Sequence, residues 1–204
     1  PLTRDGVTAH IYLLPYLEPY HLKPLFPGET IRTQQEAVER ITREMRAQLS
    51  PDAFHILVAH GLFTASSETG LSDASVGGSE LVNASFLSGF DYVALGHLHS
   101  GRSIGLPQMR YAGSPLKYSV DEAGQTKSIT ILDIAAKGEY SLSTESIPPL
   151  RDVRTVQGAF AQLLQPQPQE NREDYVFALL EDREIILNAI NRLKAVYPHI
   201  LGLK

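Results

Sequence analysis

The sequence contains no cysteine among its 204 residues. A disulfide framework is therefore excluded, and any bound metal must be held by histidine, carboxylate or carbonyl groups. Absence of cysteine also fits the reducing cytosol, so we expect a cytoplasmic protein. No apolar run approaches the roughly 20 residues that span a bilayer, and no signal-peptide pattern opens the chain, so we expect no membrane association.

Positive charge is scarce as well. There are 18 Lys and Arg residues against 23 Asp and Glu residues, a formal net charge of −5. Proteins that bind nucleic acid through bulk positive charge usually carry a basic excess, which this chain lacks. A short stretch is nevertheless basic, with Arg102, Arg110, Lys117 and Lys127. Base rates for charged loops favour a solvated rim, and the alternative is that these side chains add positive potential to a nearby site.

The first 148 residues alternate apolar runs and turn signals in the order typical of an α/β layer. A capping box, Thr33 with Glu36, opens an amphipathic helix predicted over residues 34–49. Asn83 is expected to cap a short helix that ends before Gly89. Strands are predicted at residues 9–14, 54–59, 91–95, 108–112, 128–134 and 140–147.

Two segments are predicted to be irregular, and one dipeptide to separate domains. Residues 62–80, rich in Ser, Thr and Gly, form a predicted loop, and residues 165–172 a polar connector. Pro148-Pro149 divides the chain into predicted domains of residues 1–148 and 149–204. The second domain is predicted to be a small α+β module, with strands near residues 153–156, 175–180 and 199–204 and helices at 159–164 and 184–197.

Three histidines share one placement, at the carboxyl end of an apolar strand and next to glycine. His60 precedes Gly61, and His97 and His99 follow Gly96 in the sequence F-D-Y-V-A-L-G-H-L-H. In extended backbone, positions two apart project to the same side, so His97 and His99 are predicted to face one site. Ligands bind at the carboxyl edge of α/β sheets.

The three histidines therefore predict a metal site, with two forms left open. They either bind one Zn²⁺ or supply the nitrogen ligands of a two-metal site of Mn²⁺, Fe²⁺ or Zn²⁺ that carboxylates complete. A lone strand-end histidine such as His60 is more often a hydrogen-bonded structural residue than a ligand. The remaining histidines lack this placement and are expected to be structural: His10, His21, His55 and His199.

Taken in order, these motifs resemble those of the calcineurin-like metallophosphoesterases. Within them, the chain resembles the SbcD-type nuclease subunits of bacterial complexes that process DNA ends. The segments that carry the likeness, besides the histidine motifs, are Y-A-G-S-P at 111–115, L-K-Y-S at 116–119, K-S-I-T at 127–130, P-L-R-D at 149–152 and R-L-K-A-V-Y-P at 192–198.

The resemblance implies an α/β (α+β) fold: the second half of a metallophosphoesterase β-sandwich flanked by helices, then a capping domain that positions DNA. It implies that His60 and His97 bind the second metal of a pair and His99 the first, with Mn²⁺ the expected ion. It further implies a DNA exonuclease and endonuclease acting on duplex ends and hairpins in repair and recombination. The implied partners are DNA, an SbcC-type ATPase and a second copy of the intact subunit.

Several motifs of that family are missing from the sequence. The D-x-H, Gly-Asp and Asn-His-Asp patterns do not occur, so neither the bridging carboxylate nor the family's catalytic histidine can be assigned here. We therefore expect the later part of a longer protein, inactive as an isolated chain and without firmly held metal. The alternatives are a mononuclear zinc hydrolase using all three histidines, and a non-catalytic module that binds DNA or protein.

Overall fold

The computed structural model describes residues 1–65, 81–165 and 172–204. They form two compact units, each made of two stretches of the chain. The first unit comprises Pro1–Ser114 and Ser128–Glu145, and the second comprises Pro115–Lys127 and Ser146–Lys204. Among the described residues, no helix has the length and apolar character needed to cross a membrane.

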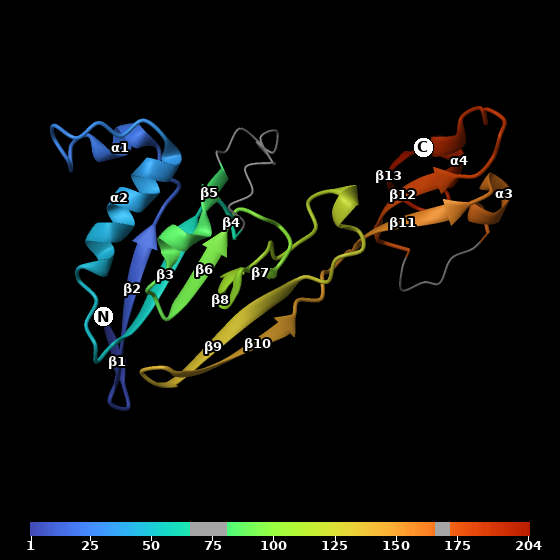
Figure 1. Cartoon of the computed structure of the whole chain (residues 1–204). Helices are drawn as coiled ribbons and strands as arrows, with labels where there is room; N and C mark the ends of the chain where they lie inside the picture. The colour runs from blue at the N-terminus through green and yellow to red at the C-terminus, as the bar shows by residue number, and fades with distance from the viewer. Residues whose placement is uncertain (66–80, 166–171) are drawn as a thin grey trace. The chain divides into compact units, whose positions relative to one another are not determined.

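A six-stranded sheet forms the centre of the first unit, in the order β1-β2-β3-β6-β8-β7 (Figure 1). Its four middle strands run parallel, and the two edge strands pair antiparallel. The α/β layer predicted from the sequence is thus present. The strands are β1 (Leu2–Arg4), β2 (Val7–Leu14), β3 (Phe54–His60), β6 (Tyr92–Gly96), β7 (Arg102–Ile104) and β8 (Leu106–Tyr111).

Helices cover one face of this sheet (Figure 1). They are α1 (Pro19–Leu22), α2 (Gln34–Arg46) and the 3-10 turn η2 (Ala84–Leu87). The capping box is confirmed, because Thr33 Oγ1 accepts the Glu36 N–H at 3.1 Å and Glu36 Oε2 accepts the Thr33 N–H at 3.4 Å. The helix ends three residues before the predicted end. Val38 on its buried face joins one core with Leu87 of η2 and with strand residues Leu57, Val93 and Leu95.

The opposite face of the sheet is covered at one end by a hairpin of β9 (Ser128–Ala136) and β10 (Glu139–Ser146). Phe54 at the start of β3 packs edge-on against Tyr140, with ring centroids 5.5 Å apart. Farther along, Leu13 and Val58 are neighbours in register, and they remain 70% and 40% exposed. A second layer over this end is not seen in the described residues, so the metallophosphoesterase sandwich stays a prediction.

A short parallel pair, β4 (Leu62–Thr64) and β5 (Leu81–Asn83), was not predicted. β4 replaces the first three residues of the expected loop at 62–80, and β5 begins directly after that loop. Residues 66–80 of the loop lie outside the described residues. Asn83 does cap the turn that follows, since its Oδ1 accepts the Ser85 N–H at 2.9 Å. The turn is a 3-10 helix, and Gly89 after it has a φ of +95°.

The second unit is a small α+β module, as predicted. Its three strands are all parallel, in the order β11-β12-β13. The elements are η3 (Val120–Glu122), β11 (Val153–Gly158), α3 (Phe160–Leu163), β12 (Tyr175–Leu180), α4 (Ala189–Leu193) and β13 (His199–Leu203). Phe160, Val176, Leu193 and Tyr197 lie in its separate core. The predicted connector falls largely outside the described residues.

Two expectations for this unit need correction. The helix predicted over residues 184–197 is reduced to α4, because Asn188 has a left-handed φ of +56° and Ile185 before it is 94% exposed. The boundary at 148/149 also omits residues 115–127, which belong to the second unit. They are held there by backbone and side-chain contacts, including a 2.9 Å bond from the Ile147 N–H to the Lys127 carbonyl.

Candidate metal-binding edge

His60 and His97 lie at the same edge of the six-stranded sheet. β3 and β6 run parallel, and their register sets His60 beside Gly96, the residue before His97. The Gly61 N–H donates to the Gly96 carbonyl at 3.2 Å, which holds the two strand ends together. This is the carboxyl edge at which the sequence placed them.

The two imidazoles are in contact. Their ring centroids are 5.5 Å apart, and the rings are nearly perpendicular, at 88°. Glycine at position 96 makes room for this arrangement, because a Cβ there would lie only 3.1 Å from His60 Nδ1. With a larger residue there, the His60 ring would have to shift by a few tenths of an ångström.

The backbone of His97 departs from the extended conformation that we predicted. β6 ends at Gly96, and His97 has a φ of +128°, in a region that residues with a Cβ rarely adopt. Such a conformation costs about 1–3 kcal/mol and persists only where the surroundings enforce it. Strained residues of this kind cluster at functional sites.

Burial lowers the pKa of His97, and the nearby His60 and His99 lower it further. The neutral imidazole of His97 is therefore favoured over a wider pH range than in water. Neutral imidazole is the form that binds a metal ion. The same influence shows that His99 lies close enough to His97 to interact electrostatically.

Backbone contacts hold the loop that carries His99, whose side chain is exposed. Its carbonyl accepts the Ser114 N–H at 3.1 Å. Gly113 has a φ of +81°, and a Cβ there would lie 2.8 Å from the Gly101 nitrogen. Gly113 and Ser114 thus brace the His99 loop.

Tyr111 is a structural residue of this edge that sequence reasoning missed. Its buried hydroxyl donates to the Gly61 carbonyl at 2.9 Å and accepts the Phe63 N–H at 2.7 Å. The hydroxyl thereby holds the chain immediately after His60. Its place in the motif Y-A-G-S-P gave no signal of this contact, because the partners are about fifty positions away in sequence.

The residues present fit only the nitrogen part of a metal site. Within residues 1–65, 81–165 and 172–204, no three His, Asp or Glu side chains are grouped so as to hold a metal ion. The structure brings His60 and His97 together and leaves His99 nearby without completing a three-histidine cage. The metal roles of His60, His97 and His99 stay predictions, and the geometry does not favour the mononuclear zinc alternative.

The solvated basic rim was wrong for two of its four members. Lys117 and Lys127 belong to the second unit, where Lys117 forms a partly buried ion pair with Asp152 and Lys127 a buried one with Glu122. Arg110 donates its Nε–H to Thr130 at 3.2 Å, whereas Arg102 is exposed.

The other four histidines have structural partners. His55 is buried, with Nε2 at 2.7 Å from the Ser50 carbonyl and Nδ1 at 3.3 Å from the Tyr12 hydroxyl. His10 packs against the ring of His55, and His21 accepts the Glu18 N–H. His199 bonds to Glu173 at 3.0 Å.

Comparison with known proteins supports the resemblance that the motifs predicted. Residues 149–204 match the SbcD C-terminal family model, described as "Type 5 capsule protein repressor C-terminal domain". The whole chain aligns with the SbcD subunit of the SbcCD nuclease from Staphylococcus epidermidis, at 29% identity over 208 residues. The alignment covers 54% of that relative, so the chain spans about half of its length.

Proposed function

We propose that this chain, a relative of the SbcD nuclease subunit along its whole length, forms part of a metal-dependent DNA nuclease. The proposed reaction is hydrolysis of DNA phosphodiesters, as an exonuclease at duplex ends and an endonuclease at hairpins. One observation carries the proposal: His60 and His97 meet at the carboxyl edge of a parallel sheet with His97 in a strained backbone conformation.

The three histidines are the proposed imidazole ligands of two divalent ions, with Mn²⁺ expected. His60 and His97 would hold one ion and His99 the other. A bound pair of cations supplies activated water and neutralises charge on the phosphate oxygens. The chain's own contribution is to keep His97 neutral by burial and to fix the orientation of His60 through Gly96 and Tyr111.

We expect the isolated chain to be inactive, because its described residues provide no carboxylate grouped with the histidines. Purified chain incubated with Mn²⁺ and linear duplex DNA should leave the DNA intact. Degradation that disappears on His97→Ala would contradict this expectation, since it would show a complete site within these residues.

A chimera tests the proposed function itself. The 208-residue segment of the Staphylococcus epidermidis protein that aligns with this chain is replaced by the chain. We expect Mn²⁺-dependent cleavage of linear duplex DNA, and at least a hundredfold loss for His60→Ala or His97→Ala, on the order of the effect of removing an essential charge-stabilising group. His10→Ala is the matched control, because His10 is a strand histidine away from the edge.

A folded chimera without activity would overturn the proposal. Folding is checked by circular dichroism before the assay, so that an unfolded chimera is not scored. Activity that survives both His60→Ala and His97→Ala would equally reject the assigned ligands.

DNA, an SbcC-type ATPase and a second copy of the intact subunit are the proposed partners, in the cytoplasm. The relative is named as one subunit of the SbcCD nuclease, which supports a role within a complex. Residues 149–204 carry seven Lys or Arg residues and seven Asp or Glu residues, so contact with DNA would rest on placed side chains rather than on net charge.

A further inference from the structure

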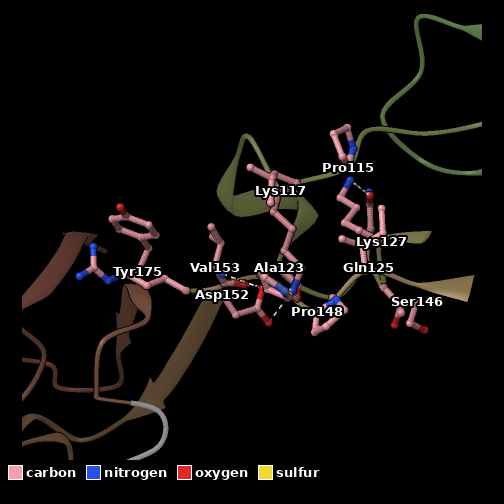
Figure 2. A pocket seen from close by; sticks show the side chains of 16 residues that line it. Pro115, Lys117, Ala123, Gln125, Lys127, Ser146, Pro148, Asp152, Val153 and Tyr175 are labelled. Atoms are coloured by element: carbon pink, nitrogen blue, oxygen red, sulfur yellow. Dashed lines mark hydrogen bonds and ion pairs between the residues drawn. The ribbon is translucent and has the colours of Figure 1, made fainter. Parts of the chain in front are cut away.

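The second unit contains a pocket of about 390 Å³ that no assigned activity uses (Figure 2). This is within the size range of small-molecule sites, about 300–1,000 Å³. All of its lining residues belong to the second unit. Much of its wall is apolar, formed by Pro115, Leu116, Ile147, Pro148, Pro149 and Val153.

Lys117 lines the pocket, but its ammonium group is already bonded within the protein and is not available to a ligand. Figure 2 shows its side chain extending to Asp152. The ammonium lies 2.7 Å from the Ala123 carbonyl, 2.9 Å from Asp152 Oδ1 and 3.2 Å from the Val153 carbonyl. Three acceptors match its three N–H donors. Lys117 therefore ties the segment 115–127 to the start of β11.

Lys127 is neutralised in a similar way. Its ammonium lies 2.6 Å from Glu122 and 2.8 Å from the Gln125 side-chain oxygen, and it is only 6% exposed. The two lysines thus shape the wall, and neither adds net charge to the pocket.

Arg151 is the third cation of the lining, and it differs from both lysines. Its side chain is 40% exposed, and in the part of the chain that the structure describes its ion pair is a long 3.7 Å contact with Glu173. Glu173 has a shorter bond, 3.0 Å, to His199. The guanidinium carries five N–H donors in a planar fork that matches phosphate. It can therefore donate to an anion in the pocket.

Tyr175 places an aromatic ring in the same lining. β11 and β12 pair with Val153 beside Tyr175, and the Tyr175 N–H donates to the Asp152 carbonyl at 2.7 Å. The ring is 37% exposed and contacts His199 at a centroid distance of 5.7 Å. An exposed tyrosine ring and an arginine that line one pocket suit a ligand with a flat body and an anionic group.

We infer that this pocket binds one nucleotide, with its base against Tyr175 and the proline-rich wall and its phosphate at Arg151. The choice of nucleotide rests on the proposed nuclease function, which would supply the ligand either as a released mononucleotide or as the end of a strand. The shared chemistry is a 5′-phosphate joined to a planar base. Thr126 and Ser146 add hydroxyl groups to the lining.

Binding is measured on the whole chain by NMR titration in EDTA, so that hydrolysis plays no part. The probes are 5′-dAMP, deoxyadenosine and inorganic phosphate. We expect 5′-dAMP to bind best, and Arg151→Ala to weaken it at least about tenfold, the effect of losing a charged hydrogen bond. Tyr175→Leu should weaken it at least about fivefold through lost stacking. Arg151→Lys should recover part of the affinity.

Arg183→Ala and Tyr20→Leu are the matched controls, because both residues are exposed and lie outside the pocket lining. Neither should change the affinity. Tetranucleotides with and without a 5′-phosphate distinguish the two sources: phosphate-dependent binding identifies a strand end, and binding of 5′-dAMP alone identifies the released nucleotide.

Inorganic phosphate that binds as tightly as 5′-dAMP would overturn the inference, as would an affinity unchanged by Arg151→Ala. Absence of 5′-dAMP binding would overturn it too. Because the titration involves no metal and no cleavage, none of these three outcomes bears on the result of the chimera experiment.

Discussion

The ammonium of Lys127 and the carboxylate of Glu122 form a 2.6 Å ion pair in which both side chains are more than nine-tenths buried. A buried pair gives little net stability compared with an apolar pair, but loss of one partner leaves an uncompensated charge. Because both residues belong to residues 115–127, the pair holds that segment in its folded form, and Lys117 ties the segment to Asp152.

We predict that Lys127→Met destabilises the second unit by about 3–5 kcal/mol, because Glu122 is left buried without its partner. The double variant Glu122→Leu with Lys127→Met should recover most of that loss. Urea denaturation followed by circular dichroism measures both. A double variant as unstable as the single one would show that the pair does more than neutralise itself.

His97→Gly should leave the first unit about 1 kcal/mol more stable than His97→Ala does. Relief of about 1–3 kcal/mol of backbone strain exceeds the entropic cost of glycine, about 0.5–1 kcal/mol. His97→Ala keeps the strained backbone and serves as the reference. In the chimera, both variants should lose Mn²⁺-dependent cleavage.

Thermal denaturation compares the two variants in one buffer. A glycine variant no more stable than the alanine variant would mean that the positive φ at His97 carries no cost. Because both variants lack the imidazole, the cleavage assay tests the ligand role of His97, and the difference in stability between them tests the strain.

Tyr111→Phe removes the hydroxyl that bonds to the Gly61 carbonyl and to the Phe63 N–H, just after the end of β3. The buried Phe63 N–H loses its acceptor, which should cost about 1–3 kcal/mol. Because the same hydroxyl holds the Gly61 carbonyl, the chimera should also bind Mn²⁺ more weakly. Tyr140→Phe, at an aromatic contact on the hairpin, is the control for loss of a tyrosine hydroxyl.

The capping box of α2 predicts that the stability of the fold depends on pH. Hydrogen bonds from the Arg32 and Thr33 N–H groups hold the pKa of Glu36 below its usual 4.5. A carboxylate whose pKa is depressed by folding stabilises the fold above its unfolded pKa, and this contribution disappears as the pH falls through its folded pKa. Glu36→Gln should therefore be less stable than the parent at neutral pH, with a difference that narrows below pH 4.5.

Thermal denaturation from pH 7 to pH 3 tests this. Glu145→Gln, at an exposed carboxylate outside the cap, should show no such convergence. Thr33→Ala removes the other half of the box and should cost about 1 kcal/mol at every pH in that range. A difference in stability between Glu36→Gln and the parent that stays constant from pH 7 to pH 3 would contradict the assigned hydrogen bonds.

Helix caps and strands could be predicted from the sequence, because each depends on residues that are close together in the chain. The Thr33–Glu36 box, the apolar runs of β3 and β6, and the Asn83 cap each depend on neighbours within four positions, and each is present. Periodicity failed at residues 184–197, because nothing local announced that Asn188 adopts a left-handed conformation.

The rest of the site depends on contacts between distant residues. Tyr111 reaches Gly61, and Lys117 reaches Asp152, across 50 and 35 positions. Charge counting could not distinguish a lysine whose ammonium has three acceptors in the fold, such as Lys117, from a solvated one. The apolar run before His60 correctly placed it at the end of a strand. The alternation rule, applied to His97 and His99, failed at His97, where the strand has already ended.

The two units are interleaved along the chain, and this limits how they can be exchanged between proteins. A segment cut to residues 149–204 would leave Asp152 without Lys117 and the pocket without the wall formed by residues 115–127. The shortest continuous segment that carries the whole second unit is residues 115–204, and it brings β9 and β10 of the first unit with it. Recombination within a gene could therefore not transfer the second unit alone as one uninterrupted module.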